Sequence, residues 1–235
     1  MTFVSVVTHI PASFALRYLP ATPKLYFQEV LGTVWKGSAQ ALRWQGTPLG
    51  ILNWQFNLWS LFTGNVEVET HLSGILGLSA HGNLGYGVKG IYANNFLLSA
   101  PATFVQSFIP YPVPVSLSGQ FDLTVQEYQL NEPFCDTLKG YLTWSRGNVV
   151  SQLGMVNPGH VIVTLSCDTG SLVLNGRSES DALRSEFNVS LDPNQRYEVN
   201  GWFINGEALP EGIKDQLGWL GKPDNEGRYR LSFSG

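Results

Sequence analysis

The chain has 235 residues and a formal net charge of −4, and only 14% of its residues are charged, well below the roughly 25% of an average soluble domain. Lysine and arginine form no run anywhere in the sequence. The composition therefore excludes nucleic acid as a favoured partner, and no apolar stretch is long enough to form a complete membrane-spanning helix.

Residues 1–20, "MTFVSVVTHIPASFALRYLP", are uncharged up to Arg17. They have no charged leader and no small-residue cleavage site, so they make a poor signal peptide. The segment reads either as the trailing end of a membrane helix or as an ordinary buried N-terminal segment, and its composition allows both.

The stretch "GTVWKGSAQALRW" at residues 32–44 is either an aromatic ligand motif or the signature of a fold. A related stretch, "CDTLKGYLTW", occurs about a hundred residues later. The recurrence favours a fold signature, in which the tryptophans pack and the glycines let strands bend or approach closely. The motif residues are Gly32, Trp35, Gly37, Trp44 and Trp144.

Strand-type alternation dominates the sequence. In "NWQFNL", Trp54 and Phe56 alternate with polar residues, and the same period of two recurs in "NVEVETHL", "SGQFDLTVQEYQL", "HVIVTLSC", "SEFNVSL" and "GRYRLSFSG". Helical periodicity is confined to three short pieces that start at prolines, at residues 11–18, 101–108 and 210–220. This pattern predicts an all-β protein with a few short helices.

The two halves of the chain repeat one order of elements: a Gly/Trp segment, several strands, a short helix that starts at a proline, and a closing strand. We expect two similar repeats of about 100 residues, at about 31–131 and 135–235. Together they predict one large, twisted and curled antiparallel sheet rather than two independent domains.

No catalytic, cofactor or metal site stands out among the motifs. "GYGVKG" at residues 85–90 matches G-x-G-x-x-G, but it lies among strands and turns instead of a βαβ unit, so we expect turn glycines. Glu67 and Glu69 alternate with valines, which favours a solvated strand face over an acid–base pair. His71 and His81 have no nucleophile or metal partner near them in the sequence.

The densest apolar cluster contains two tryptophans and two phenylalanines within residues 54–62. Packing in the core of a large sheet is the favoured interpretation, and a ligand groove or partner surface is the alternative.

The chain has two cysteines, Cys135 and Cys167. They are too few for a zinc site, because the four histidines supply no matching spacing. Free buried thiols and a disulfide both remain open from the residues alone.

The order of these segments resembles a known family. "VLGTVWKGSAQALRW" followed by "LGILNWQFNLWSLFTG" is similar to the opening of protein N of the bacterial type II secretion system. A cysteine before "LKGYLTW", then "HVIVTLSCDTGSLVL", and the closing "LGWLGKPDNEGRYRLSFSG" are similar to the second half of that family.

The resemblance implies an inner-membrane protein with one membrane helix and a periplasmic domain. Residues 1–20 would be the helix exit and first periplasmic residues, and residues 21–235 a single periplasmic β domain, with most of the anchor helix absent from this chain. The family's paired cysteines correspond to Cys135 and Cys167, so the resemblance implies a disulfide, which persists in the periplasm.

The resemblance further implies a non-enzymatic accessory subunit of the inner-membrane platform, without cofactor or small-molecule substrate. Its expected partners are platform proteins C, L and M, and the outer-membrane secretin. A lipid- or hydrophobe-binding β-groove protein anchored at the inner membrane is the alternative function.

Overall fold

The structure is a computed structural model that describes residues 10–16, 25–75, 77–109 and 114–235. The expected membrane-exit segment, residues 1–20, lies mostly outside the described residues. The structure describes residues 10–16 of it, which include the short helix α2 (Ala12–Leu16). Within the described part of the chain, no helix is long and apolar enough to cross a membrane.

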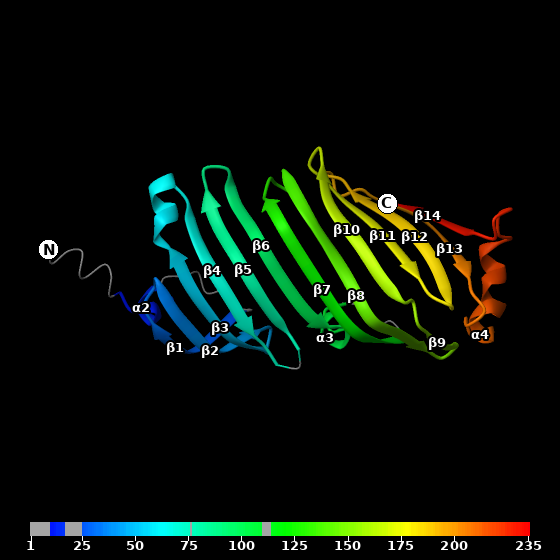
Figure 1. The fold of residues 1–235 in the computed structure, drawn as a ribbon, viewed down its shortest axis with the longest axis horizontal. Coiled ribbons are helices and arrows are strands. Elements are labelled where there is room, and N and C mark those ends of the chain that lie inside the picture. Colours follow the sequence, from blue (N-terminus) through cyan, green and yellow to red (C-terminus); the bar gives the residue numbers. More distant parts are fainter. Residues whose placement is uncertain (1–9, 17–24, 76, 110–113) are drawn as a thin grey trace. The chain divides into compact units, whose positions relative to one another are not determined.

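An antiparallel sheet of 14 strands contains most of the described backbone, and its strand order follows the chain, with β9 paired beside β8 (Figure 1). The strands are β1 (Leu25–Gly32), β2 (Lys36–Trp44), β3 (Thr47–Asn57), β4 (Val66–Ser73), β5 (Ser79–Gly87), β6 (Gly90–Pro101), β7 (Val115–Gln129), β8 (Thr137–Ser151), β9 (Gly154–Val156), β10 (His160–Asp168), β11 (Ser171–Glu179), β12 (Leu183–Leu191), β13 (Tyr197–Asn205) and β14 (Tyr229–Ser234). The predicted fold class, a large antiparallel sheet with a few short helices, is confirmed.

The chain divides into two compact units, Met1–Leu98 (unit 1) and Ser99–Gly235 (unit 2). The division falls within β6, so unit 1 contains β1 to β5 and most of β6, and unit 2 contains the rest. The expected repeat boundaries lie about thirty residues further along the chain, and the duplication stays a prediction.

Short helices follow the three prolines at which helix starts were expected. Besides α2, they are α3 (Ala102–Gln106), α4 (Glu211–Lys214) and the 3₁₀ helix η2 (Asp215–Leu220). A second 3₁₀ helix, η1 (Leu58–Thr63), was not expected. The Asn57 side chain caps its start by accepting a hydrogen bond from the Trp59 N–H at 3.2 Å, and Gly64 ends it at φ 76°.

The sheet of unit 2 has one polar and one apolar face, because successive side chains on a strand point to opposite sides. One row across β10 to β14 is polar: Thr164, Asn175, Asn188, Asn200 and Ser232. The next row, on the other face, is apolar: Leu165, Leu174, Val189, Val199 and Phe233.

Unit 1 follows the same rule. On β3, Trp54 and Phe56 are half-buried, whereas Asn53, Gln55 and Asn57 are exposed, as the alternation predicted.

Few apolar residues are fully buried in the part of the chain that the structure describes. The buried apolar residues among those described are Ala12, Ala39, Leu42, Leu78, Ala100, Ala102, Cys135, Val163, Ala182, Leu209 and Leu217. Many other apolar side chains of the described strands are half-buried or exposed instead of fully enclosed. Contiguous groups of such side chains are candidates for contact with other molecules.

Candidate functional site

The tryptophans of the repeated sequence motif lie in packing positions. Trp35, in the turn between β1 and β2, sets its ring edge-on to Phe56 with the centroids 5.9 Å apart. Trp44 is half-buried at the end of β2. Trp144 on β8 stacks on Phe121 of β7 at 5.2 Å.

The motif glycines are required by the backbone and by a neighbouring ring. Gly32 ends β1 with φ 88°, a conformation that favours glycine. A Cβ atom on Gly37 would lie 2.5 Å from Cζ2 of Trp54, so the indole of Trp54 lies directly over this glycine. The Trp54 Nε1–H also donates a hydrogen bond to the Val34 carbonyl at 3.0 Å.

In unit 2 a tryptophan also lies over a glycine, but both residues belong to one strand, β8. A Cβ atom on Gly147 would lie 2.6 Å from Cε2 of Trp144, and the Trp144 Nε1–H donates to the Ser118 carbonyl at 3.0 Å. Trp54 instead covers Gly37 on the neighbouring strand. Sequence reasoning missed the contact between Trp54 and Gly37, because strand register decides which residues lie opposite each other.

A disulfide joins Cys135 to Cys167, with the Cα atoms 6.1 Å apart, as the family resemblance implied. Cys135 is buried in the connection between β7 and β8, and Cys167 lies on β10. The same connection is held by Tyr128, whose hydroxyl donates to the Phe134 carbonyl at 2.6 Å. Burial raises the pKa of Tyr128.

An exposed apolar tip occurs where β3 turns into β4 in unit 1. The apolar tip consists of Leu58, Trp59, Leu61 and Phe62 on η1. Trp59 is 80% exposed and Phe62 is 85% exposed, and their ring centroids are 5.8 Å apart. The predicted core packing is therefore wrong for the second half of the 54–62 cluster, because the unexpected 3₁₀ helix carries these side chains out of the sheet.

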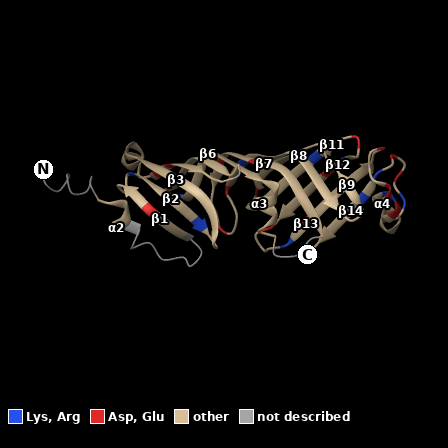
Figure 2. Cartoon of the chain, turned by 90° about the horizontal axis from the view of Figure 1, so that it is seen from below, with Lys and Arg blue, Asp and Glu red and all other residues tan. Residues whose placement is uncertain are grey.

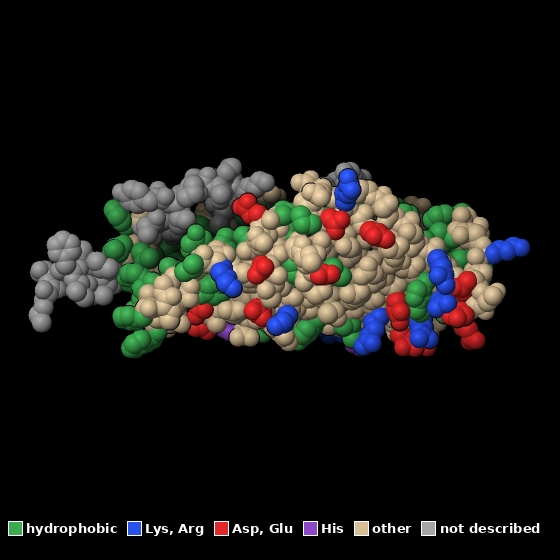
Figure 3. All heavy atoms as spheres, turned by 90° about the horizontal axis from the view of Figure 1, so that it is seen from above, with side chains coloured by type: hydrophobic (Ala, Val, Ile, Leu, Met, Phe, Trp, Pro, Cys, Tyr) green, Lys and Arg blue, Asp and Glu red, His purple; other side chains and the backbone are tan. Residues whose placement is uncertain are grey.

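The turn between β5 and β6 lies beside this tip. The Asn65 side chain, which follows η1, lies within contact distance of Gly87, and the neighbouring Val88 is 93% exposed. Figure 3 shows hydrophobic side chains at the surface at this end of unit 1. Charged side chains instead gather at the other end of the chain, around α4 and the turn before β14 (Figure 2).

The apolar face of unit 2 contains a groove of about 390 Å³ beside α4 and η2. Its walls come from β12, β13 and β14 on one side and from the helices on the other, and include Leu183, Phe187, Phe203, Leu209, Ile213 and Leu217. Ligand pockets fall in the range of about 300–1,000 Å³. The groove therefore has the size and lining of a site for a small apolar ligand.

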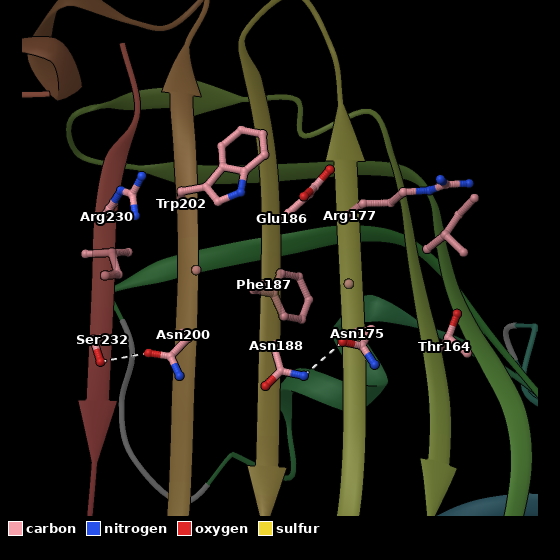
Figure 4. A pocket seen from close by; sticks show the side chains of 14 residues that line it. Thr164, Asn175, Arg177, Glu186, Phe187, Asn188, Asn200, Trp202, Arg230 and Ser232 are labelled. Carbon is pink, nitrogen blue, oxygen red and sulfur yellow. Dashed lines mark hydrogen bonds between the residues drawn. The ribbon is translucent and has the colours of Figure 1, made fainter. Parts of the chain in front are cut away.

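The opposite face of unit 2 contains a polar hollow of about 720 Å³ (Figure 4). The Asn188 amide donates to Asn175 Oδ1 at 2.8 Å, and the Ser232 hydroxyl donates to Asn200 Oδ1 at 2.8 Å, so neighbouring strands are linked in pairs. Charged and aromatic side chains of the next row, Arg177, Glu186, Trp202 and Arg230, complete its lining.

The carboxylates and the glycine-rich segment of unit 1 belong to the sheet. Glu67 accepts hydrogen bonds from the Asn57 amide at 3.0 Å and from the Tyr92 hydroxyl at 3.2 Å. Burial, and then the nearby Glu67 charge, raise the pKa of Tyr92. Residues 85–90 form the end of β5, a two-residue turn and the start of β6, so the predicted turn interpretation is correct.

Comparison with known proteins identifies a family. The family model described as type II secretion system (T2SS), protein N, matches residues 23–232. No solved structure matches this chain.

Curated relatives match over nearly the whole chain. The type II secretion system protein N of Vibrio cholerae serotype O1 (strain ATCC 39315 / El Tor Inaba N16961) is 38% identical over 233 residues, which cover 98% of this chain and 92% of the relative. The protein of the same name from Aeromonas hydrophila is 30% identical, with 98% and 92% covered. That from Pectobacterium carotovorum subsp. carotovorum is 27% identical, with 98% and 91% covered.

Proposed function

This chain belongs to the family of type II secretion system protein N, and we propose that it acts as a non-enzymatic accessory subunit of the secretion machine through protein–protein contacts. In this proposal the domain lies on the periplasmic side of the inner membrane. Its partners are the platform proteins C, L and M and the secretin. The observation that carries the proposal is the apolar tip of unit 1.

The apolar tip has the composition of a protein-binding hot spot. Trp59 and Phe62 stand side by side at the surface, on a short helix without charged residues. A large aromatic side chain buries about 150–250 Å² in an interface, which at about 25 cal/mol per Å² corresponds to about 4–6 kcal/mol of gross burial free energy. Monomeric surfaces rarely keep a contiguous cluster of such side chains exposed unless a partner covers it, whereas a single exposed apolar side chain is common.

The two edge strands of the sheet offer a second mode of contact. β1 and β14 are the first and last strands of the sheet, and among the described strands each pairs with one neighbour. Edge N–H and C=O groups can add a strand from a partner, with main-chain hydrogen bonds supplying affinity.

Binding measurements with the purified periplasmic domains of C, L, M and the secretin test the proposal. The double variant Trp59→Ser/Phe62→Ser should weaken at least one contact by about 30-fold, the effect of losing about 2 kcal/mol at a hot spot. Trp219→Ser is the matched control, because Trp219 is 75% exposed on η2 of unit 2. Failure of all four domains to bind would refute the proposal, and equal binding by the double variant would refute the role of the tip.

A second candidate function, binding of a lipid acyl chain, is favoured by the apolar groove of unit 2. The groove is lined almost entirely by aliphatic and aromatic side chains, which suits a hydrocarbon chain. Native mass spectrometry of the purified protein should then show a bound lipid. Ile213→Trp, which fills the groove, should abolish that binding, whereas Ile162→Trp on the polar face should not. Absence of lipid from the unaltered chain, or equal lipid in both variants, would contradict this function.

A further inference from the structure

Two histidines that are ten residues apart in the sequence face each other on the polar side of unit 1. His71 on β4 and His81 on β5 are direct partners in the antiparallel register. Their side chains are exposed, and their Nδ1 atoms are 3.5 Å apart. The two rings are 5.5 Å apart between centroids and inclined by 63°.

This spacing matches that of two ligands on one tetrahedral metal ion. Zinc–nitrogen bonds are about 2.0–2.1 Å long. At a tetrahedral angle, two such bonds place the nitrogen atoms about 3.4 Å apart. The observed 3.5 Å therefore falls within the roughly 0.2 Å tolerance expected of a metal site. It is longer than an ordinary hydrogen bond from a ring N–H, which is about 2.7–3.2 Å.

The strand pairing places the two histidines opposite each other without a metal. β4 and β5 pair continuously from Val66 to Ser73 and from Ser79 to Tyr86, and the histidines lie within this ladder rather than at a frayed end. A pair of ligands fixed on adjacent strands loses little conformational freedom when it binds an ion, which favours affinity.

The surroundings of the pair favour a cation. Glu69 lies two residues before His71 on the same face of β4, and its side chain lines the same hollow as His81. Asn53 of β3 is the register partner of His71 on the other side, and Asn83 lies two residues after His81 on the same face of β5. The charged groups on this face of the neighbouring strands are Glu67 and Glu69 on β4 and Lys36 on β2.

We propose that His71 and His81 form an exchangeable site for a divalent transition-metal ion, zinc by geometry, that binds through both Nδ1 atoms. Among the described residues, no group of three or more histidine, cysteine, aspartate or glutamate side chains is placed to hold a metal. Water therefore fills the remaining coordination positions. The bound ion links β4 to β5, and the coordination positions that hold water face solvent. The site stands independently of the proposed role in secretion.

Isothermal titration of Zn²⁺ into the full chain without an affinity tag tests the site directly. The unaltered chain should bind one ion, and His71→Gln or His81→Gln should each weaken binding by at least about tenfold. His160→Gln is the matched control, because His160 is exposed on β10 without a histidine opposite it. Glu69→Gln should weaken binding by only a few-fold, because it removes charge without removing a ligand.

A second measurement separates a metal site from a hydrogen-bonded histidine pair. Co²⁺ in place of Zn²⁺ should change its visible absorption when it binds through the two imidazole nitrogens, whereas a hydrogen-bonded pair without a metal gives no such change. Absence of binding to the unaltered chain, equal binding by both histidine variants, or loss of binding only in His160→Gln would overturn the proposal. Circular dichroism confirms that each variant is folded.

Discussion

Removal of the Cys135–Cys167 disulfide should lower the free energy of unfolding by about 4–5 kcal/mol. The bridge spans a sequence separation of 32 residues. Closing a loop of this size lowers the entropy of the unfolded chain, which stabilises the fold by about 3.7 kcal/mol at 25 °C. Cys135 is buried, so its replacement by alanine adds a small cavity that costs about 1 kcal/mol. The largest part of the effect therefore arises in the unfolded chain, whose freedom the bridge restricts.

Urea unfolding of the unaltered chain and of Cys135→Ala/Cys167→Ala measures the difference. The midpoint should fall in the variant, and a reductant should lower the midpoint of the unaltered chain while leaving the variant unchanged. Hydrogen exchange locates the effect, because the bridge ties the β7–β8 connection to β10. Amides of these strands should lose protection, and amides of β1 to β4 should keep it.

Two results would refute this reasoning. A change in unfolding free energy below about 1 kcal/mol would show that the bridge does not restrict the unfolded chain as the loop length requires. Two reactive thiols in native protein from an oxidising compartment would show that the bridge does not form.

Two further changes test local packing and charge. Gly37→Ala should lower the free energy of unfolding by about 1–3 kcal/mol, because the new Cβ atom would lie 2.5 Å from the Trp54 ring. Gly218→Ala is the control, because its Cβ atom meets nothing within 4 Å. Equal melting temperatures for both variants would contradict the prediction. Hydrogen bonds from the backbone N–H of Arg228 and from nearby groups hold the pKa of Asp224 well below its usual range. Asp224 therefore stabilises the fold above the ordinary aspartate pKa, and this contribution is lost as the pH falls below that value. Asp224→Asn should lower the melting temperature at pH 7 and should matter less near pH 2, whereas an equal effect at both pH values would argue against the ionised carboxylate.

The sheet and its two faces were predictable from the sequence because a strand that is buried on one side alternates apolar and polar residues. Alternation in "NWQFNL" placed Trp54 and Phe56 on the half-buried side and the polar residues at the surface. Prolines 101 and 210 marked two helix starts, since proline favours the first turn. These are local rules, so they hold before any tertiary contact is known.

The surface features could not be predicted, because they depend on how neighbouring strands and turns are placed. Trp59 and Phe62 continue an apolar strand in the sequence, and only the 3₁₀ turn after Asn57 carries them into solvent. The capping residues Asn57 and Gly64 were the available signal. His71 and His81 are ten residues apart in the sequence, and only the β4–β5 register places their rings opposite each other.

Photo-crosslinking in cells tests the central claim, that this domain works by contact with other secretion components. A photoreactive amino acid replaces Trp59 at the apolar tip in cells that assemble the secretion machine, and the same residue replaces Trp219 in a parallel strain as the control. We expect a crosslinked product with platform protein C, L or M or with the secretin from position 59 and none from position 219. No such product from position 59, with the protein present at its normal level, would contradict it.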